Sequence, residues 1–202
     1  MEFKDLVLAR RSVHNFEPDF KVDQNTWKAL LEYVRYTPSG YNAQPWKFKL
    51  IQDDTVLQKM HQLCYKQDHI LTAGNLVVLI GDVQFGKNEA ERVVAEWRQY
   101  RAFTDKQAEA LQASLVKDRA EWKQREMVIR NSSLAAMTFM YAAQDLGLAT
   151  CPMMGFRQLD LKRVLGLKEN ELPIMLIALG KAGKTEAVQL PRKTANELNH
   201  EN

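Results

Sequence analysis

The sequence has 202 residues, of which 46% are hydrophobic, and its 28 lysines and arginines against 25 aspartates and glutamates give a net charge of +3. This length fits one domain over residues 1–202, and the apolar content is sufficient for a packed core. The charge is too small for a general nucleic-acid binder, which concentrates many uncompensated cations on one face. An anionic small molecule is enough to explain it.

The two cysteines, Cys64 and Cys151, lie far apart and in no C-x-x-C or histidine-rich pattern. We therefore expect neither a disulfide framework nor a metal site. The N-terminal segment carries acidic residues without an apolar signal region, and no run reaches the roughly 20 apolar residues that cross a bilayer. A reducing cytoplasm is the expected location, with no membrane partner.

A short amphipathic segment over residues 3–10 precedes a more clearly patterned helix. Asp23 can cap that helix, and its apolar residues repeat at i, i+3, i+4 and i+7, which places them on one face. They are Trp27, Leu30, Leu31 and Val34. The helix is expected to end before Pro38, because the residue before a proline disfavours helical backbone.

Two strands are predicted in the first half of the chain. Apolar and basic residues alternate over 46–50, which predicts a half-exposed strand. The continuous apolar run over 76–80, closed by Gly81, is typical of a strand buried on both faces at a sheet centre. Between the two strands, Asp54 can cap a short helix over residues 54–64.

Residues 87–145 contain no proline and are compatible with helix throughout. An interruption is expected near Phe103, where Asp105 can cap a new helix. The stretch 134–143 is apolar almost all round, as expected for a helix buried on every side, and Gly147 is well placed to end it.

The last regular elements are a short helix over 160–165 and a second buried strand over 173–180. Strands separated by helices indicate an α+β or α/β arrangement around a small mixed sheet. The strand over 173–180 runs into a G-K-T sequence like that of a P-loop, but Ala178 stands where the first glycine should be. The segment before Pro191 is also too short for the required helix, so nucleotide hydrolysis is not expected.

Three potential cations and a hydroxyl are concentrated in residues 10–14, as Arg10, Arg11, Ser12 and His14. Guanidinium groups match phosphate oxygens in a two-pronged geometry, and serine adds a neutral hydrogen bond. Taken alone, such a basic run is more often solvated surface. It becomes a candidate phosphate site only when it is considered together with two later motifs.

The first later motif, Pro38 to Trp46, places two prolines, a glycine and several amide or hydroxyl side chains between a helix and a strand. It is either an ordinary turn or a rigid loop that can hydrogen-bond a planar heterocycle. The second motif, Pro152 to Phe156, follows the apolar helix. By itself it is typical of a core-lining connection in which flexible methionines fill space.

Together these motifs resemble the FMN-dependent nitroreductase family, through P-S-x-x-N-x-Q-P-W over Pro38 to Trp46 and P-x-x-G-F over Pro152 to Phe156. The resemblance covers essentially the whole chain. It implies an α+β nitroreductase fold, with a long buried helix at a homodimer interface and FMN sites between the subunits. It also implies reduction of nitroaromatics, quinones or similar electron-poor compounds by NADH or NADPH, in a ping-pong sequence.

The resemblance assigns cofactor-binding residues to three parts of FMN. Those implied at the phosphate end are Arg10, Arg11, Ser12, His14, Arg192 and Lys193. Those implied from the partner subunit are Pro38, Ser39, Gly40 and Asn42. Met154 and Gly155 are implied beside flavin N5, and the polar segment 66–69 matches ribityl contacts only loosely. No catalytic acid or base is predicted, because solvent or the flavin can supply protons.

Two departures from the family pattern leave alternatives open. His14 stands where arginine or lysine is usual, and Met154 stands where many relatives have glutamate, so the acceptor is not defined. Trp97, Tyr100 and Phe103 either cover the flavin face or serve as ordinary packing. The alternative functions are another flavin reaction, such as dehydrogenation or dehalogenation, and a flavin-binding or redox-sensing protein with little turnover.

Overall fold

The structure is a computed structural model that describes residues 2–100, 103–185 and 187–200. Four strands form one sheet in the order β1-β2-β4-β3, and each neighbouring pair is antiparallel. Their bounds are β1 (Trp46–Ile51), β2 (Asn75–Asp82), β3 (Ala149–Met153) and β4 (Glu171–Gly180). The α+β prediction is confirmed. The sheet was expected to be mixed, but it is antiparallel. Parallel pairing within the described part of the chain is limited to an isolated bridge.

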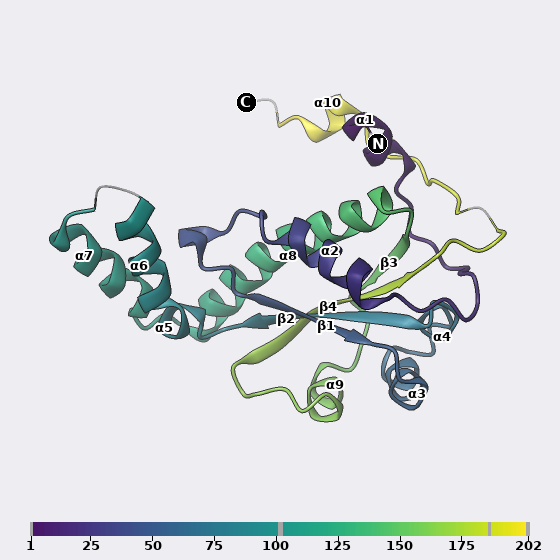
Figure 1. Ribbon diagram of the computed structural model, residues 1–202, viewed down its shortest axis with the longest axis horizontal. Helices are drawn as coiled ribbons and strands as arrows, with labels where there is room; N and C mark the ends of the chain where they lie inside the picture. Colours follow the sequence, from purple (N-terminus) through teal and green to yellow (C-terminus); the bar gives the residue numbers. More distant parts are fainter. Residues whose placement is uncertain (1, 101–102, 186, 201–202) are drawn as a thin grey trace.

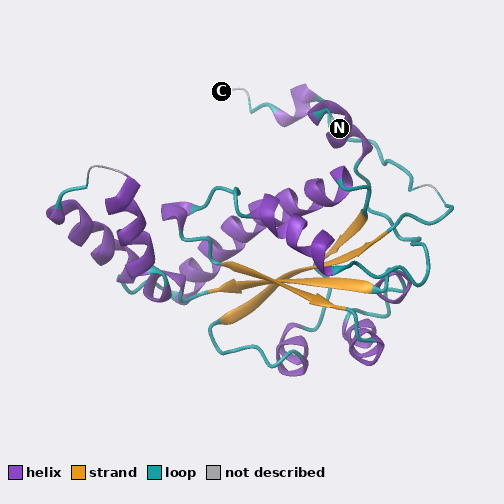
Figure 2. Cartoon of the chain, in the orientation of Figure 1, coloured by secondary structure: helices purple, strands orange, loops and turns teal. Residues whose placement is uncertain are grey.

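Helices cover both faces of this sheet (Figures 1 and 2). One face carries α2 (Gln24–Val34) and the long α8 (Glu121–Asp145), and the other carries α3 (Asp54–Leu63), α4 (His69–Thr72) and α9 (Gln158–Val164). The N-terminal α1 (Phe3–Ala9) and the C-terminal α10 (Ala195–Leu198) lie above the α2 and α8 layer in Figure 1. None of the described helices combines the length and apolar character needed to span a membrane.

The central strand β2 divides its side chains between two cores. Val77 and Leu79 join the cluster under α2 and α8, whereas Leu76 and Val78 join the cluster over α3 and α9. All four side chains are fully buried. This alternation is what a pleated strand between two helical layers produces, so the prediction of a strand buried on both faces is confirmed.

The starts of α2 and α3 follow the expected capping chemistry, with one correction at α3. The Asp23 carboxylate accepts hydrogen bonds from the backbone N–H groups of Asn25 and Thr26, at 2.8 and 2.9 Å, and caps α2 as predicted. The cap of α3 is Asp53, and Asp54 is already the first helical residue. The predicted Asp54 cap was therefore wrong by one residue, because a cap needs extended backbone before the helix.

The region before α8 forms a small separate cluster of helices at one end of the molecule (Figure 1). It contains α5 (Phe85–Asn88), α6 (Ala90–Tyr100) and α7 (Asp105–Val116). Thr104, and not the predicted Asp105, caps α7 through a reciprocal capping box with Gln107. The break between α7 and α8 was not predicted, since its residues are individually compatible with helix.

The long helix α8 is buried only in part within one chain. Ala135, Ala136 and Phe139 are buried against the sheet side, and Phe139 stacks on Phe48 with ring centroids 5.2 Å apart. Leu134 on the other side is 50% exposed. The expectation of burial on every side is therefore wrong for the protomer, because two layers leave one helix face uncovered. Gly147, with φ of +74°, ends the segment as predicted.

The structure has an edge strand, β3, at the start of the segment Pro152 to Phe156, which by its sequence alone indicated a connection. Cys151 pairs with Ala178 and Pro152 with Ile177 across the β3–β4 ladder. A proline removes a backbone donor, which argues against a strand when the sequence is considered alone, but an edge strand tolerates it. On its outer side, β3 makes the isolated parallel bridge between Ser12 and Thr150.

Both cysteines are free and buried, and this predicts unreactive thiols. Burial raises the pKa of the Cys64 thiol and of the Cys151 thiol to about 11, and at Cys151 the Arg10 charge acts in the opposite direction. At pH 8 both thiols therefore remain protonated, and the thiolate is the reactive form. We expect no alkylation by iodoacetamide in the folded protein, measured by intact mass, and two alkylated thiols after denaturation. Rapid labelling of the folded chain at pH 8 would contradict this expectation.

Candidate functional site

The basic segment 10–14 runs beside the edge strand β3. Ser12 bridges Thr150 in parallel, and the Val13 N–H donates to the Thr150 carbonyl oxygen at 3.0 Å. Because a strand advances about 3.3 Å per residue, Met154 lies about 13 Å further along this edge. The structure thus brings the basic segment 10–14 and the motif Pro152 to Phe156 to one sheet edge, with polar groups at one end and an exposed turn at the other.

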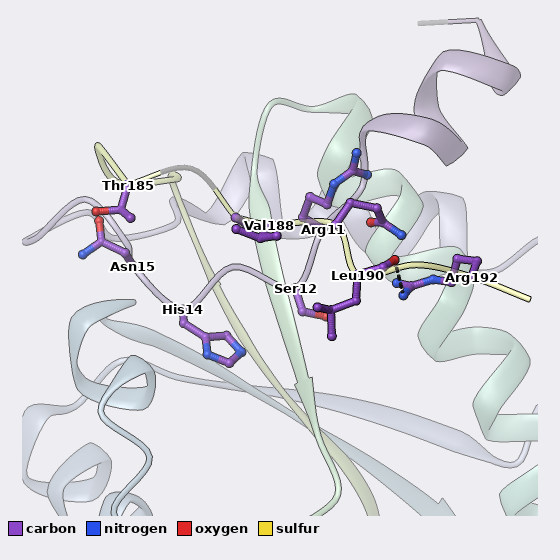
Figure 3. A pocket seen from close by; sticks show the side chains of 10 residues that line it. Arg11, Ser12, His14, Asn15, Thr185, Val188, Leu190 and Arg192 are labelled. Carbon is purple, nitrogen blue, oxygen red and sulfur yellow. Dashed lines mark hydrogen bonds between the residues drawn. The ribbon is translucent and has the colours of Figure 1, made fainter.

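A cavity of about 390 Å³ lies between this segment and the C-terminal chain (Figure 3). The labelled side chains that line it are Arg11, Ser12, His14, Asn15, Thr185, Val188, Leu190 and Arg192. Figure 3 shows Ser12, Leu190 and Arg192 toward one end, and Asn15 with Thr185 at the other. The predicted Arg192 therefore joins the N-terminal motif, whereas Lys193 is exposed and does not line this cavity.

A second cavity, of about 680 Å³, shares Arg11, Leu190 and Arg192 with the first and adds Arg10. Its apolar wall is formed by α1, α8 and the C-terminal segment, and includes Met137. The predicted arginines are therefore gathered around two adjoining cavities. Such a cluster of guanidinium groups suits an anion, because their charge is kept at any working pH.

Arg10 and Arg11 differ in how their guanidinium groups are engaged. Arg11 Nη1 donates to the carbonyl oxygens of Leu8 and Arg10, and Figure 3 shows its side chain turned away from His14. Arg10 Nη1 is buried and finds no hydrogen-bond partner among the residues that the structure describes. A buried donor without a partner is costly, so an anionic acceptor at Arg10 would remove that cost.

Two histidines lie together beside this site. The rings of His14 and His69 stack with centroids 4.8 Å apart and planes 21° apart. Burial lowers the pKa of His69, the nearby His14 lowers it further, and Asp68 acts in the opposite direction. His69 Nε2 is buried without a partner in the described part of the protein.

The segment before His69 reaches the turn after β3. Gln67 Nε2 donates to the Gly155 carbonyl oxygen at 3.3 Å and to the Cys64 carbonyl oxygen at 3.0 Å. Met154 beside it is 78% exposed. The loose sequence match over residues 66–69 therefore does fall at the candidate site. It was hard to find from sequence, because its neighbours in the site lie on distant parts of the chain.

The loop from Pro38 to Trp46 contains the short helix η1 (Gly40–Asn42) and is held by side-chain hydrogen bonds. The Gly40 N–H donates to Asn131 Oδ1 at 2.8 Å, and the Gln44 N–H donates to Ser39 Oγ at 3.0 Å. This loop lies beside α6, at the opposite end of α8 from residues 10–14 (Figure 1). Within one chain, the structure does not bring Pro38, Ser39, Gly40 and Asn42 to the basic cluster.

A third cavity, of about 700 Å³, opens between this loop and α6. Its lining includes Asn42, Gln44, Trp97 and Tyr100. Phe103 packs edge to face on Trp97, with centroids 5.3 Å apart, and does not line this cavity. Trp97 and Tyr100 thus line a cavity beside the loop, and their predicted role as a cover of the flavin face stays a prediction. The contacts of Phe103 favour the packing alternative.

These features define an α+β protein with a basic sheet edge and a separate polar loop. Comparison with known proteins assigns it further: the Nitroreductase family pattern matches residues 7–181. The chain is 32% identical over 204 residues to MhqN of Bacillus subtilis, provisionally named an NAD(P)H nitroreductase, covering 98% of this chain and 97% of that protein. The chain belongs to the Nitroreductase family, as its motifs indicated.

Solved structures agree on the fold. The crystal structure of YdfN from Bacillus subtilis, provisionally called a nitroreductase, has a TM-score of 0.92 at 28% identity, with 99% of this chain and 98% of that chain covered. A structure from Exiguobacterium sibiricum, described as a complex with FMN, has a TM-score of 0.85 at 22% identity, with 100% and 98% covered. The predicted nitroreductase fold is confirmed.

Proposed function

We propose that this protein is an FMN-dependent NAD(P)H oxidoreductase that reduces nitroaromatics, quinones or similar electron-poor acceptors. The observation that carries the proposal is Arg10 Nη1, which is buried and has no partner among the described residues, on the sheet edge that ends at Met154 and Gly155. A phosphate at one end and a flat ring at the other would match that edge. The printed names of relatives, which include an NAD(P)H nitroreductase and an NAD(P)H-flavin oxidoreductase, support this assignment.

The residues along the edge fit FMN in chemical type. Arg10, Arg11 and Arg192 provide charge for a phosphate dianion, and Ser12 and His14 add hydrogen-bonding groups. His69 Nε2, which has no partner among the described residues, would offer a polar contact between the two ends. Lys193 stays a weaker candidate, because it is exposed outside the two cavities.

When bound, FMN accepts electrons from a nicotinamide and passes them to the acceptor. The protein's own part is to bind, orient and shield. The arginines hold the phosphate end, and the exposed, apolar Met154 places no carboxylate at the other end. Since no side chain in this arrangement is dedicated to proton transfer, we assign no catalytic acid or base, and solvent supplies protons.

The active unit in this proposal is a homodimer of one-domain subunits in the cytoplasm. Each protomer holds the basic edge and the loop with Pro38, Ser39, Gly40 and Asn42 at separate ends, so a second copy would supply the loop. The uncovered face of α8, with Leu134 50% exposed and Ile129 37% exposed, offers apolar surface for that copy. Trp97 and Tyr100 would then cover the shared site.

The proposal predicts that the purified protein carries FMN, and that its absorbance responds to nicotinamide. Anaerobic NADH or NADPH should bleach the yellow colour, and a quinone should restore it. One open face must serve the donor and then the acceptor, so initial rates should give parallel double-reciprocal lines. Heat-released cofactor is identified by chromatography. Stoichiometric FAD would refute the cofactor, and a spectrum unchanged by both nicotinamides would favour the flavin-binding or sensing alternative.

A further inference from the structure

Arg92 on α6 connects this helix to the loop that contains Asn42. The Arg92 guanidinium is half-buried, and its Nη2 donates to the carbonyl oxygens of Asn42 and Ala43 at 3.3 and 3.0 Å. On its other sides, Nε donates to Glu89 at 2.6 Å and Nη1 to Glu96 at 2.7 Å. The two carboxylates orient the guanidinium, and the guanidinium holds the loop backbone.

The loop backbone has a conformation that requires such support. Tyr41, Asn42 and Gln44 have φ values of 60, 57 and 47°, in the left-handed region that residues other than glycine rarely adopt. Strained conformations persist only where surrounding contacts determine them. The contacts from Arg92 fall in the middle of this strained stretch, on residues 42 and 43.

Arg92 also acts on the Asn42 side chain, through Glu96. One oxygen of Glu96 accepts from Arg92 Nη1, and the other accepts from Asn42 Nδ2 at 3.0 Å. The Asn42 amide oxygen accepts from Gln44 Nε2 at 3.3 Å. The orientation of Asn42, a residue implied to contact the flavin, is thus set by a hydrogen-bond chain that begins at Arg92.

We propose that Arg92 is a positioning residue for the cofactor: it clamps the loop of residues 39–44 to α6 in the shape that binds the flavin. The identity of the bound group rests on the proposed function, whereas the clamp itself does not. The same helix presents Trp97 and Tyr100 to the third cavity. Arg92 would therefore hold the loop of residues 39–44 next to the two aromatic residues that are proposed to cover the shared site.

The test compares Arg92→Gln and Arg92→Lys with a matched control, Arg98→Gln. Arg98 lies on the same helix and pairs with Asp105 at 3.0 Å, outside the loop contacts. We expect Arg92→Gln to weaken FMN binding about tenfold, measured by flavin fluorescence titration, because preorganisation and charge-assisted hydrogen bonds are lost. Lysine keeps the charge but lacks the planar guanidinium with its several donors, so Arg92→Lys should recover only part of the affinity. Arg98→Gln should bind FMN with wild-type affinity.

A second readout separates a local clamp from general stability. In cofactor-free protein, amide hydrogen exchange of the 39–45 peptide should be faster in Arg92→Gln, while exchange in β2 and β4 is unchanged. The proposal is overturned if Arg92→Gln exchanges like wild type in this peptide, if β2 and β4 also lose protection, or if FMN affinity is unaffected. If wild type itself binds no FMN, the proposed function fails, and the exchange comparison still decides whether Arg92 holds the loop.

Discussion

A mixed dimer that pairs an Arg10→Ala subunit with a Ser39→Ala/Asn42→Ala subunit is expected to recover one tight FMN site, although each parent homodimer has two damaged sites. The basic edge and the loop occupy separate ends of the protomer (Figure 1). If each site combines the edge of one subunit with the loop of the other, one of the two sites in the mixed dimer contains only wild-type residues. The other site carries all the substitutions.

This experiment needs the two variants to be co-expressed with different tags and purified through both. Fluorescence titration should then give about one tight site per dimer, and a doubly tagged wild-type dimer should give two. The recovered site should have wild-type affinity, because it lacks any substitution. If the mixed dimer has no tight site, the edge and the loop act within one chain. Sedimentation of an active, FMN-loaded monomer would reject the shared site altogether.

The second large effect is expected from Arg10 alone. Arg10→Ala should weaken FMN binding by about 1.5–3 kcal/mol, or roughly 10- to 150-fold, the usual loss for a charge-assisted hydrogen bond. Its Nη1 is buried without a partner in the described structure, so the bound phosphate would be its main acceptor. Arg11→Ala should lose less, because Arg11 Nη1 already donates to the Leu8 and Arg10 carbonyl oxygens.

The measurement is an FMN titration of each cofactor-free variant at one fixed salt concentration, since the interaction is electrostatic. Arg163→Ala is the matched control, because this exposed arginine pairs with Asp160 on α9, away from the edge. Thermal unfolding checks that the variants keep their fold. Wild-type FMN affinity in both Arg10→Ala and Arg11→Ala would return the basic segment to solvated surface.

The elements that local pattern predicted correctly are those whose stability depends on residues close together in the chain. The i, i+3, i+4 spacing after Asp23 predicted α2, and the apolar run before Gly81 predicted β2. Helix starts were less accurate, since Asp53 and Thr104 cap where Asp54 and Asp105 were expected. Neighbouring polar residues compete for such a position, and the path of the incoming chain selects one.

The strand β3 depends on a distant partner and could not be predicted from its own residues. Pro152 argues against a strand, and only the pairing of Ala149–Met153 with the end of β4 makes one. The exposure of Leu134 on α8 has a similar origin, because apolar composition indicates burial but does not say which surface covers it.

For the candidate site, the sequence indicated which residue types take part, but it did not indicate how they come together in space. Arg10, Arg11, Ser12 and His14 are adjacent in the chain, so their shared chemistry was visible before the fold was known. Their placement on the same sheet edge as Met154 depends on the bridge between Ser12 and Thr150. The stacking of His69 on His14, the Arg92 clamp and the separation of the loop from the basic edge arise likewise from contacts between distant segments, which only tertiary packing creates.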